Sequence, residues 1–390
     1  MQIDQSDRGL LIVAGEASGD LHGARLLAAL RELDPRIRAF GLGGGELQAA
    51  GMEVIARSSE ISVVGITEVA RILPRARQIF QLVLAEVDQR STRTALLIDF
   101  PDFNLRLAKA LKRRDVRILY YISPQVWAWR KGRVRTISKL IDRMLVILPF
   151  EVDFFRRHGV ETVHVGHPLV DEVPELPHRW DLEQSQQEPL QIALLPGSRA
   201  SEIDSNLPVM LEAATRLCRR FDCQFRLIKA STIDERTLAG PLARTGLSVE
   251  VVRGDRFAVI ADSHLAICAS GTATLEVGLL RTPMIVVYRV SAWTYLLGRL
   301  LVRLPHIALV NLVLGKRAVP ELIQHAATAD GIADTAAEIL GDRGRIRAMR
   351  DDLGGLRGQL GLSGASQRAA SEVFKELGKG TGSNVGGVVS

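Results

Sequence analysis

Two turns in the second half of the chain have the residue types of a phosphate site. Residues 269–276 (ASGTATLE) follow an apolar, strand-like run and open an apolar-periodic helix. Backbone N–H groups around Ser270, Gly271 and Thr272 could face a phosphate there, and Glu276 on the first helical turn could reach the hydroxyls of a sugar. An ordinary turn between a strand and a helix explains this segment equally well when it is taken alone.

Residues 194–199 (LLPGSR) make the second turn, where a buried strand ends in Gly197 and Ser198 and presents an arginine. The planar guanidinium of Arg199 suits a pair of phosphate oxygens and could neutralise the charge of a departing diphosphate. A single arginine after a strand is more often an exposed surface residue. Two such turns in one half of the chain favour a nucleotide-sugar diphosphate as the ligand.

Polar residues also follow predicted strands in the first half of the chain. The three segments are residues 15–20 (GEASGD), 99–104 (DFPDFN) and 123–130 (SPQVWAWR). Ligands bind beyond the carboxyl ends of strands in open parallel sheets, so we expect all three segments to line one cleft. Asp99 lies beside two aromatic residues, and partial desolvation would raise its pKa toward that of a general base. Asp102 fits a helix N-cap better, and Glu16 fits a sugar-hydroxyl ligand and a helix cap equally well.

Short apolar runs alternate with helical periodicity along the chain. The strands predicted in the first half are residues 10–14, 39–42, 94–98, 117–122, 143–147 and 162–165, and those in the second half are 192–195, 224–228, 248–252, 265–268 and 284–288. Strands that alternate with helices form parallel doubly wound sheets. The predicted fold class is therefore α/β, with two Rossmann-like domains that face one another across a cleft.

The domain boundaries follow from changes in composition. We predict the first domain over residues 1–173 and the second over residues 190–345, with a proline-rich, polar linker at 174–189. Helices at 346–377 should pack back toward the N-terminal domain. The tail at 378–390, rich in Gly, Ser and Val, has no periodicity and should be disordered.

Composition limits the class of protein. A chain of 390 residues with 47% hydrophobic content is long enough for two folded domains. Its three cysteines have no metal-ligand spacing, which favours a reduced, cytoplasmic setting without a disulfide or structural zinc. Residues 1–8 lack the pattern of a signal peptide, and no apolar run reaches the roughly 20 residues that span a bilayer. The net charge of +6 indicates anionic partners: nucleic acid, phosphorylated metabolites or an acidic membrane surface.

Two apolar segments carry arginines in the manner of membrane-surface helices. Residues 61–80 place aliphatic side chains beside arginines, with Pro74 expected to interrupt the helix, and residues 292–304 combine aromatics with a basic pair. The membrane-contact residues predicted in these segments are Val64, Ile66, Val69, Ile72, Leu73, Trp293 and Leu296. A helix packed on the sheet with its charged face in water explains residues 61–80 at least as well.

Together these segments resemble one family, the lipid-A-disaccharide synthases, which are inverting glycosyltransferases of the GT-B type. The motifs are GEASGD (15–20), SVVGITEV (62–69), DFPDFN (99–104), YISPQVWAWR (121–130), LPFE (148–151), GHPL (166–169), LLPGSR (194–199), ASGTATLE (269–276) and YR (288–289). They occur in the family's order, and the resemblance runs from about residue 10 to 375. So many ordered matches make it specific, although each motif alone would be weak.

The resemblance implies an enzyme that joins UDP-2,3-diacylglucosamine to 2,3-diacylglucosamine 1-phosphate, giving the β(1→6) lipid A disaccharide 1-phosphate and UDP. Asp99 would deprotonate the acceptor hydroxyl, with Glu16 as a second catalytic residue. The binding residues implied are Gly19, Asp20, Gly197, Ser198, Arg199, Ser270, Gly271, Thr272, Glu276, Arg289 and Asn311. No DxD pair is evident, so no metal or other cofactor is expected.

Acyl chains on both substrates would give the apolar segments a purpose. The N-terminal domain would then face the acceptor and the membrane, and the C-terminal domain would bind the UDP-sugar. We expect a cytoplasmic protein that associates peripherally with the inner face of the cytoplasmic membrane. The family also suggests a homodimer.

Other interpretations remain open. A UDP-N-acetylglucosamine 2-epimerase or the peptidoglycan N-acetylglucosaminyltransferase shares the two-domain build, but the apolar segments and DFPDFN argue against both. A non-catalytic module that binds nucleic acid or anionic lipid explains the charge, but not a carboxylate and an arginine turn directed at one cleft; we expect no nucleic-acid partner. The chain departs from the family at Val310, where a proline is expected before Asn311.

Overall fold

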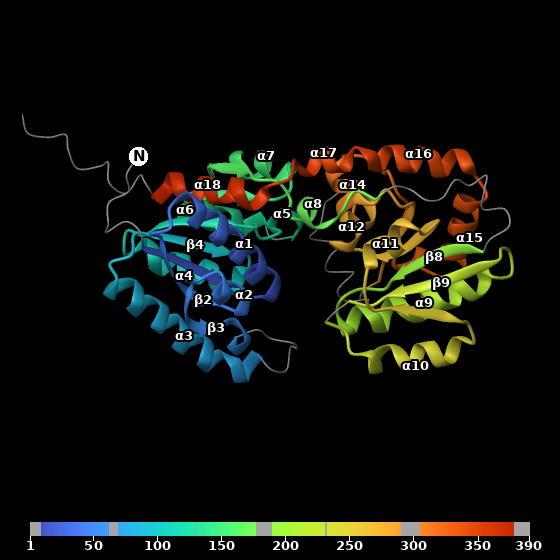
Figure 1. The fold of residues 1–390 in the computed structure, drawn as a ribbon, viewed down its shortest axis with the longest axis horizontal. Helices are drawn as coiled ribbons and strands as arrows, with labels where there is room; N and C mark the ends of the chain where they lie inside the picture. The colour runs from blue at the N-terminus through green and yellow to red at the C-terminus, as the bar shows by residue number, and fades with distance from the viewer. Residues whose placement is uncertain are drawn as a thin grey trace, which may run out of the picture. The chain divides into compact units, whose positions relative to one another are not determined.

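The computed structural model describes residues 9–61, 69–129, 131–176, 189–230, 232–289 and 305–377; of residues 69–72, 128, 129 and 131 it describes only the backbone. The chain divides into two compact units. The first is Met1–Pro168 together with Gly361–Ser390, and the second is Leu169–Leu360. The first unit is thus built from both ends of the chain, and the second from one continuous segment (Figure 1).

A parallel sheet forms the centre of the first unit. Its described strands, in spatial order, are β3 (Glu53–Arg57), β2 (Arg38–Gly43), β1 (Gly9–Ala14), β4 (Thr94–Ile98), β5 (Arg117–Tyr121), β6 (Arg143–Val146) and β7 (Thr162–His164). The inner strands are buried on both faces, which is why β1 and β4 form continuous apolar runs in the sequence. Strand order reverses between β1 and β4, where Ala14 pairs with Ile98. The turns that follow these two strands therefore lie at the switch point, where ligands bind in such folds.

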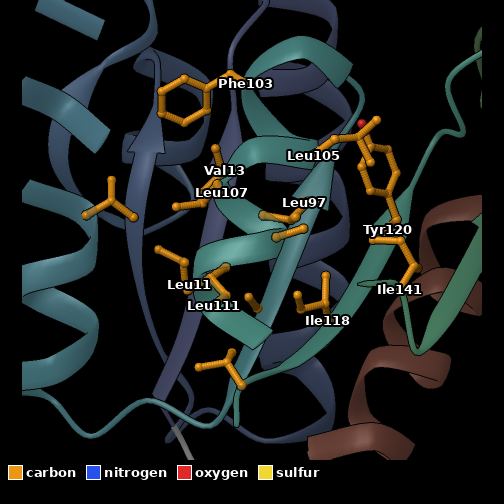
Figure 2. Close-up of a cluster of buried hydrophobic side chains, with 14 of the residues drawn as sticks. Leu11, Val13, Leu97, Phe103, Leu105, Leu107, Leu111, Ile118, Tyr120 and Ile141 are labelled. Atoms are coloured by element: carbon orange, nitrogen blue, oxygen red, sulfur yellow. The ribbon is translucent and has the colours of Figure 1, made fainter. Parts of the chain in front are cut away.

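Helices cover both faces of this sheet. One face carries α3 (Val69–Gln89), α4 (Pro101–Lys112), α6 (Val134–Leu140) and α7 (Phe150–Arg156), and the other carries α1 (Ala17–Leu33), α2 (Gly45–Ala49) and α18 (Ala365–Leu377). A short helix, α5 (Val126–Trp129), follows β5. Figure 2 shows the first core, where Leu107 and Leu111 of α4 pack with Leu11 and Leu97 of the sheet. Their spacing of four residues puts both leucines on one face of α4.

The second unit has the same plan. Its described strands, in spatial order, are β10 (Val249–Val252), β9 (Cys223–Ile228), β8 (Leu190–Leu195), β11 (Leu265–Ala269), β12 (Met284–Tyr288) and β13 (Glu321–Ile323). Its described helices are α8 (Leu169–Glu172), α9 (Ala200–Leu217), α10 (Glu235–Thr245), α11 (Arg256–Ala261), α12 (Ala273–Leu279), α14 (Leu309–Leu314), α15 (Ala329–Leu340), α16 (Arg343–Gly354) and α17 (Leu356–Leu360). The order reverses between β8 and β11, where Leu195 pairs with Cys268. Both predicted phosphate turns therefore follow the two strands of this switch point.

The boundary between the units lies at Pro168, earlier than the composition suggested. Helix α8 packs on α12, and Arg357 of α17 donates hydrogen bonds to the carbonyls of Val170 at 3.0 Å and Val173 at 2.9 Å. These contacts attach the segment just before the proline-rich stretch to the second unit.

Of the C-terminal helices, α18 alone belongs to the first unit, whereas α16 and α17 pack on α12 in the second. Ala369, Ala370, Val373 and Leu377 of α18 lie in the core beside α1. An enclosed carboxylate, Glu376, strengthens this docking with ion pairs to Arg117 of β5 and, at 2.9 Å, to Arg143 of β6.

Two expectations about local structure were wrong. Helix α3 continues through Pro74 instead of being interrupted there. Pro74 removes one backbone bond, to the carbonyl of Ala70, and the buried side chains of Ile79 and Val83 further along α3 hold the rest of the helix on the sheet. The edge strands β3 and β13 were not predicted, since both are short and only Ala56 of their residues is buried.

Candidate functional site

Asp99 follows strand β4 in a backbone conformation that is rare for a residue with a side chain. Its φ is 44° and that of Phe100 is 48°, so two successive residues lie in the left-handed region. The Asp99 N–H donates to the carbonyl of Tyr121 at 3.0 Å, which ties the turn to β5. Non-glycine residues held in this region cost on the order of 1–3 kcal/mol each and gather at functional sites.

The carboxyl group of Asp99 has the desolvation that the sequence predicted. Burial, together with the nearby carboxylate of Glu16, raises the pKa of Asp99 to about 6. At neutral pH most of the group is ionised, yet it is a stronger base than an exposed aspartate. Such a pKa suits a general base that works near neutrality.

The turn after β1 contacts the Asp99 turn directly. The ring of Phe100 lies against Gly15, where an added Cβ would come within 2.2 Å of it, so only glycine fits. Glu16 occupies the N-cap position of α1, but its side chain is exposed and makes no capping hydrogen bond. The capping interpretation of Glu16 therefore has no bond to support it.

Asp20 and Gly19 contact protein groups in the same turn. The buried carboxylate of Asp20 accepts N–H bonds from Gly44 at 2.6 Å, Glu46 at 3.0 Å and Leu47 at 3.3 Å, and so caps α2. A side chain at Gly19 would touch β1 and β4. Both residues were predicted to bind substrate. The three N–H bonds give Asp20 a role in shaping the turn, whereas a Cβ at Gly19 would make only ordinary contacts at 3.6 Å.

Asp102 is not the predicted helix cap. The N-cap position of α4 is occupied by Phe100, which contributes no side-chain cap. The side chain of Asp102 is 74% exposed and pairs with Arg133 at 2.8 Å.

Glu151 is a buried carboxyl whose role the sequence did not reveal, beyond its place in the LPFE motif. It accepts hydrogen bonds from Ser123 Oγ at 2.5 Å, Trp127 Nε1 at 2.9 Å and the Leu148 N–H at 3.2 Å. Burial raises the pKa of Glu151 to about 7, although the three hydrogen bonds oppose the shift. The carboxyl ties the segment after β5 to the segment after β6. Ser123 and Trp127 lie 28 and 24 residues away in the sequence, so local patterns could not identify the pairing.

In the second unit, the turn after β8 brings the predicted Gly197, Ser198 and Arg199 together with one further residue, Glu202 of α9. Gly197 has a φ of 130°, and a Cβ there would lie 2.5 Å from the Glu202 carboxylate. That carboxylate accepts the Ser198 N–H at 2.8 Å and pairs with Arg199 at 3.2 Å. An anionic group therefore already contacts the donors predicted for a phosphate.

The turn after β11 contains Ser270, Gly271 and Thr272. Gly271 has a φ of 152°, with open space where a Cβ would lie. Glu276, on the first turn of α12, is 16% exposed and pairs with Arg256 of α11 at 3.1 Å. Burial raises the pKa of Glu276, and Arg256 opposes the shift. The sequence missed Arg256 because the two partners lie on different helices.

Asn311 is enclosed within the second unit. Its Nδ2 donates to the Val319 carbonyl at 2.9 Å and to the Glu321 carboxylate at 2.7 Å, while its Oδ1 accepts the Val319 N–H at 3.0 Å. These bonds fix the entry to β13 and give Asn311 a structural role. Val310, which replaces the proline of the family, is buried in α14. Arg289 follows β12 and is exposed.

Part of the predicted membrane segments can be located. Leu73 of α3 is 59% exposed, an unusual setting for a leucine. The predicted contacts Val64, Ile66, Trp293 and Leu296, and the side chains of Val69 and Ile72, lie outside the described residues. Across the described ranges, every helix is too short or too polar to span a bilayer.

Comparisons with known proteins agree on one family. The family model described as lipid-A-disaccharide synthetase matches residues 10–371. The lipid-A-disaccharide synthase of Syntrophus aciditrophicus (strain SB) is 46% identical over 366 residues, covering 93% of this chain and 96% of the relative. That of Myxococcus xanthus (strain DK1622) is 45% identical over 373 residues, covering 94% and 97%.

Solved structures of low sequence identity share the fold. UDP-GlcNAc 2-epimerase from Neisseria meningitidis, bound to UDP-GlcNAc, matches with a TM-score of 0.60 at 10% identity, covering 94% of this chain and 100% of that chain. The calicheamicin glycosyltransferase CalG4 matches with a TM-score of 0.59 at 15% identity, covering 96% and 99%. The likeness places the two parallel α/β units in the GT-B class, as the sequence predicted.

Proposed function

The chain belongs to the lipid-A-disaccharide synthase family, and on that premise we propose roles for the residues at the two switch points. It is a glycosyltransferase that forms the lipid A disaccharide. The epimerase, the peptidoglycan transferase and the non-catalytic module are not favoured. The substrates that follow from the resemblance are UDP-2,3-diacylglucosamine and 2,3-diacylglucosamine 1-phosphate.

Asp99 acts as the general base of the transfer. Its carboxylate takes the proton of the acceptor 6-hydroxyl, whose oxygen then attacks the anomeric carbon of the donor. The bond to UDP breaks with its electron pair on the diphosphate, and attack from the opposite face inverts the configuration. Glu16, exposed beside Asp99 and without a capping bond, binds an acceptor hydroxyl and keeps the Asp99 pKa high by charge repulsion.

The turns after β8 and β11 receive the donor. Arg199 and the N–H groups near Ser198 and Gly271 bind the diphosphate, and Glu276 accepts hydrogen bonds from the ribose hydroxyls. Arg256 holds Glu276 in place through the ion pair at 3.1 Å. Exposed Arg289 adds positive charge near the same strand ends.

The observation that carries the assignment is the Asp99 carboxyl, with its pKa of about 6, in a strained turn at the switch point of the first sheet. The test is UDP release and disaccharide formation from both substrates, in detergent with EDTA, for wild type and Asp99→Ala. We expect turnover that needs the acceptor, and a loss of at least about 100-fold in Asp99→Ala.

The matched control is Asp102→Ala, which removes an exposed carboxylate from the same turn region. We expect it to keep most of the wild-type rate. Turnover that survives in a folded Asp99→Ala would move the base to another group. A wild type that releases no UDP would contradict the assignment as a whole.

We propose further that α3 contacts the inner face of the cytoplasmic membrane. Leu73 is exposed, and Arg77 lies one turn further along the helix, where it can meet anionic headgroups. In liposome flotation with anionic lipid, Leu73→Glu and Ile72→Glu should reduce binding several-fold. The comparison is Leu82→Glu, which changes another exposed leucine of α3, at 39% exposure, about two and a half turns further along the helix. Equal binding by all variants would contradict the membrane assignment.

The family also suggests a homodimer, and sedimentation velocity of the full chain tests it.

A further inference from the structure

The peptide between Asp99 and Phe100 is held by two polar side chains that no catalytic step uses. The Asp99 carbonyl accepts a hydrogen bond from Tyr120 Oη at 2.5 Å and a second from Asn104 Nδ2 at 2.8 Å. Asn104 Nδ2 also donates to the carbonyl of Ile98 at 3.2 Å. Three carbonyl contacts from two side chains thus surround the point where β4 ends.

Neither side chain is explained by packing alone. Asn104 is fully buried in the first turns of α4, although asparagine is a poor helix former and a buried amide must be matched by hydrogen bonds. Tyr120 is fully buried among leucines in the core drawn in Figure 2, where phenylalanine would fill the space without a hydroxyl to satisfy. The Tyr120 hydroxyl and the Asn104 amide nitrogen donate their hydrogen bonds to the end of β4 and the Asp99 turn.

That turn needs such support. Asp99 and Phe100 both have a φ in the left-handed region, and residues with side chains stay there only where the surroundings over-determine them. The ring of Phe100 is fixed separately, since it lies against Gly15 and stacks on Phe103 with centroids 5.7 Å apart. The bonds from Asn104 and Tyr120 fix the peptide group that joins these two strained residues.

We propose that Asn104 and Tyr120 are positioning residues that lock the Asp99 peptide in its left-handed conformation and so fix the direction of the Asp99 carboxylate. The inference rests on the proposed role of Asp99 as the base. Without the lock, the turn relaxes toward ordinary dihedral angles and the carboxylate moves away from the acceptor hydroxyl. A displacement of about 1 Å at a reacting group is enough to slow a reaction by about 100-fold.

The test compares Tyr120→Phe, Asn104→Ala and the double variant with wild type. We expect each single variant to lower kcat by roughly 10-fold to 100-fold, and the double variant to fall little below the slower single, because both bonds restrain one carbonyl. The KM for the UDP-sugar and the Kd for UDP should stay within about twofold of wild type, because the donor residues are in the second unit. Tyr120→Phe removes one hydroxyl and keeps the ring, so it is suited to a test even if Asn104→Ala folds poorly.

The pH profile separates positioning from general damage. A relaxed turn lets water reach Asp99, so the midpoint of kcat/KM should move from about 6 toward the ordinary aspartate value near 4. Partial unfolding would lower the amplitude and leave the midpoint in place. The control is Tyr121→Phe, the same chemical change at the next position of β5 with the ring in the opposite core. Its midpoint should match wild type.

The outcomes are distinct. Full kcat in both folded single variants, an unmoved midpoint with reduced kcat, or strictly additive losses in the double variant would each overturn the positioning role. A wild type without transferase activity, or an active Asp99→Ala, would instead overturn the proposed function on which this inference rests.

Discussion

Asp99 combines burial with a neighbouring carboxylate, and this combination predicts how activity depends on pH. Because the pKa of Asp99 is about 6, kcat/KM should rise about tenfold per pH unit below that value and level off above it. The profile is measured from pH 3 to 8.5 with saturating donor and with acceptor below its KM. Glu16→Gln removes the second cause of the shift and should move the midpoint to lower pH. A wild-type midpoint near 4 would mean that the base is an exposed carboxylate and not Asp99.

The same pKa makes Asp99 costly for stability, so Asp99→Asn should stabilise an inactive protein. The folded pKa of Asp99, about 6, lies above the ordinary aspartate value of 3.8, so the folded state favours the protonated form and loses stability as pH rises through 6. Asparagine removes this loss. In urea unfolding we expect Asp99→Asn to gain about 2 kcal/mol at pH 8, and clearly less at pH 5. A gain that does not change with pH would point to packing as its cause.

The Glu202 carboxylate contacts the hydrogen-bond donors that we assign to the diphosphate. Its carboxylate accepts the Ser198 N–H and pairs with Arg199, whose side chain is 78% exposed. Glu202→Gln keeps an oxygen that can accept the N–H but removes the competing charge. Calorimetry at low salt should then show UDP binding tighter by roughly twofold to fivefold, as the modest strength of an exposed ion pair allows. Glu212→Gln, which breaks the Arg216 pair on the same helix, is the control and should leave UDP affinity unchanged. Weaker binding in Glu202→Gln would show that Glu202 serves to hold the turn.

Among the elements, α18 depends on charge as well as on apolar burial. Glu376 is fully enclosed and pairs with both Arg117 and Arg143. Arg143 keeps its pairs with Glu372 and Glu161 when the Glu376 carboxylate is removed, whereas Arg117 loses its ion pair. Glu376→Gln should therefore lower the free energy of unfolding by about 2 kcal/mol. Glu161 pairs with the same Arg143 but is 56% exposed, so Glu161→Gln should cost less than about 0.5 kcal/mol. Equal effects of the two variants would contradict a special role for the enclosed pair.

The strands that the sequence predicted correctly are those whose burial appears as a continuous apolar run in the sequence. Strands β1, β4, β8 and β11 are buried on both faces and appear as apolar runs, so their turns could be assigned to strand ends and hence to one edge of a sheet. The edge strands β3 and β13 are short and mostly half-buried or exposed, and both were missed. The passage of α3 through Pro74 was also missed, because the helix is held by the packing of Ile79 and Val83 beyond the proline, which is a tertiary contact.

Partners within the candidate site were the least predictable part. Arg256 reaches Glu276 from another helix, Asn104 reaches back to the turn before it, and Glu151 gathers donors from two loops. Each pairing depends on tertiary packing and leaves no local period. Asp20 and Asn311 make hydrogen bonds with protein groups that the sequence did not reveal, and their contacts with substrate stay predictions. A motif can reflect the support of a turn as well as its chemistry.

At the scale of the whole molecule, the proposed chemistry is divided between two units of different construction. The acid–base groups belong to the first unit, which needs both ends of the chain, and the diphosphate groups belong to the second, which is the continuous segment Leu169–Leu360. A continuous unit with its own sheet and core meets the physical conditions for folding alone. The first unit does not, because a fragment ending at Pro168 lacks α18 and leaves Arg117 and Arg143 without Glu376.

We therefore expect residues 169–360, expressed alone, to fold cooperatively and to bind UDP within about tenfold of the full chain while catalysing no transfer. Residues 9–168 alone should not give a cooperative unfolding transition, because the apolar face that Val373 and Leu377 cover would be exposed to water. Circular dichroism during thermal unfolding and calorimetric titration with UDP measure both properties. Arg199→Ala in the 169–360 fragment should weaken UDP binding as much as it does in the full chain. If the fragment folds but binds UDP more than tenfold more weakly than the full chain, the first unit must supply nucleotide contacts, and the division of the chemistry between the units would be wrong.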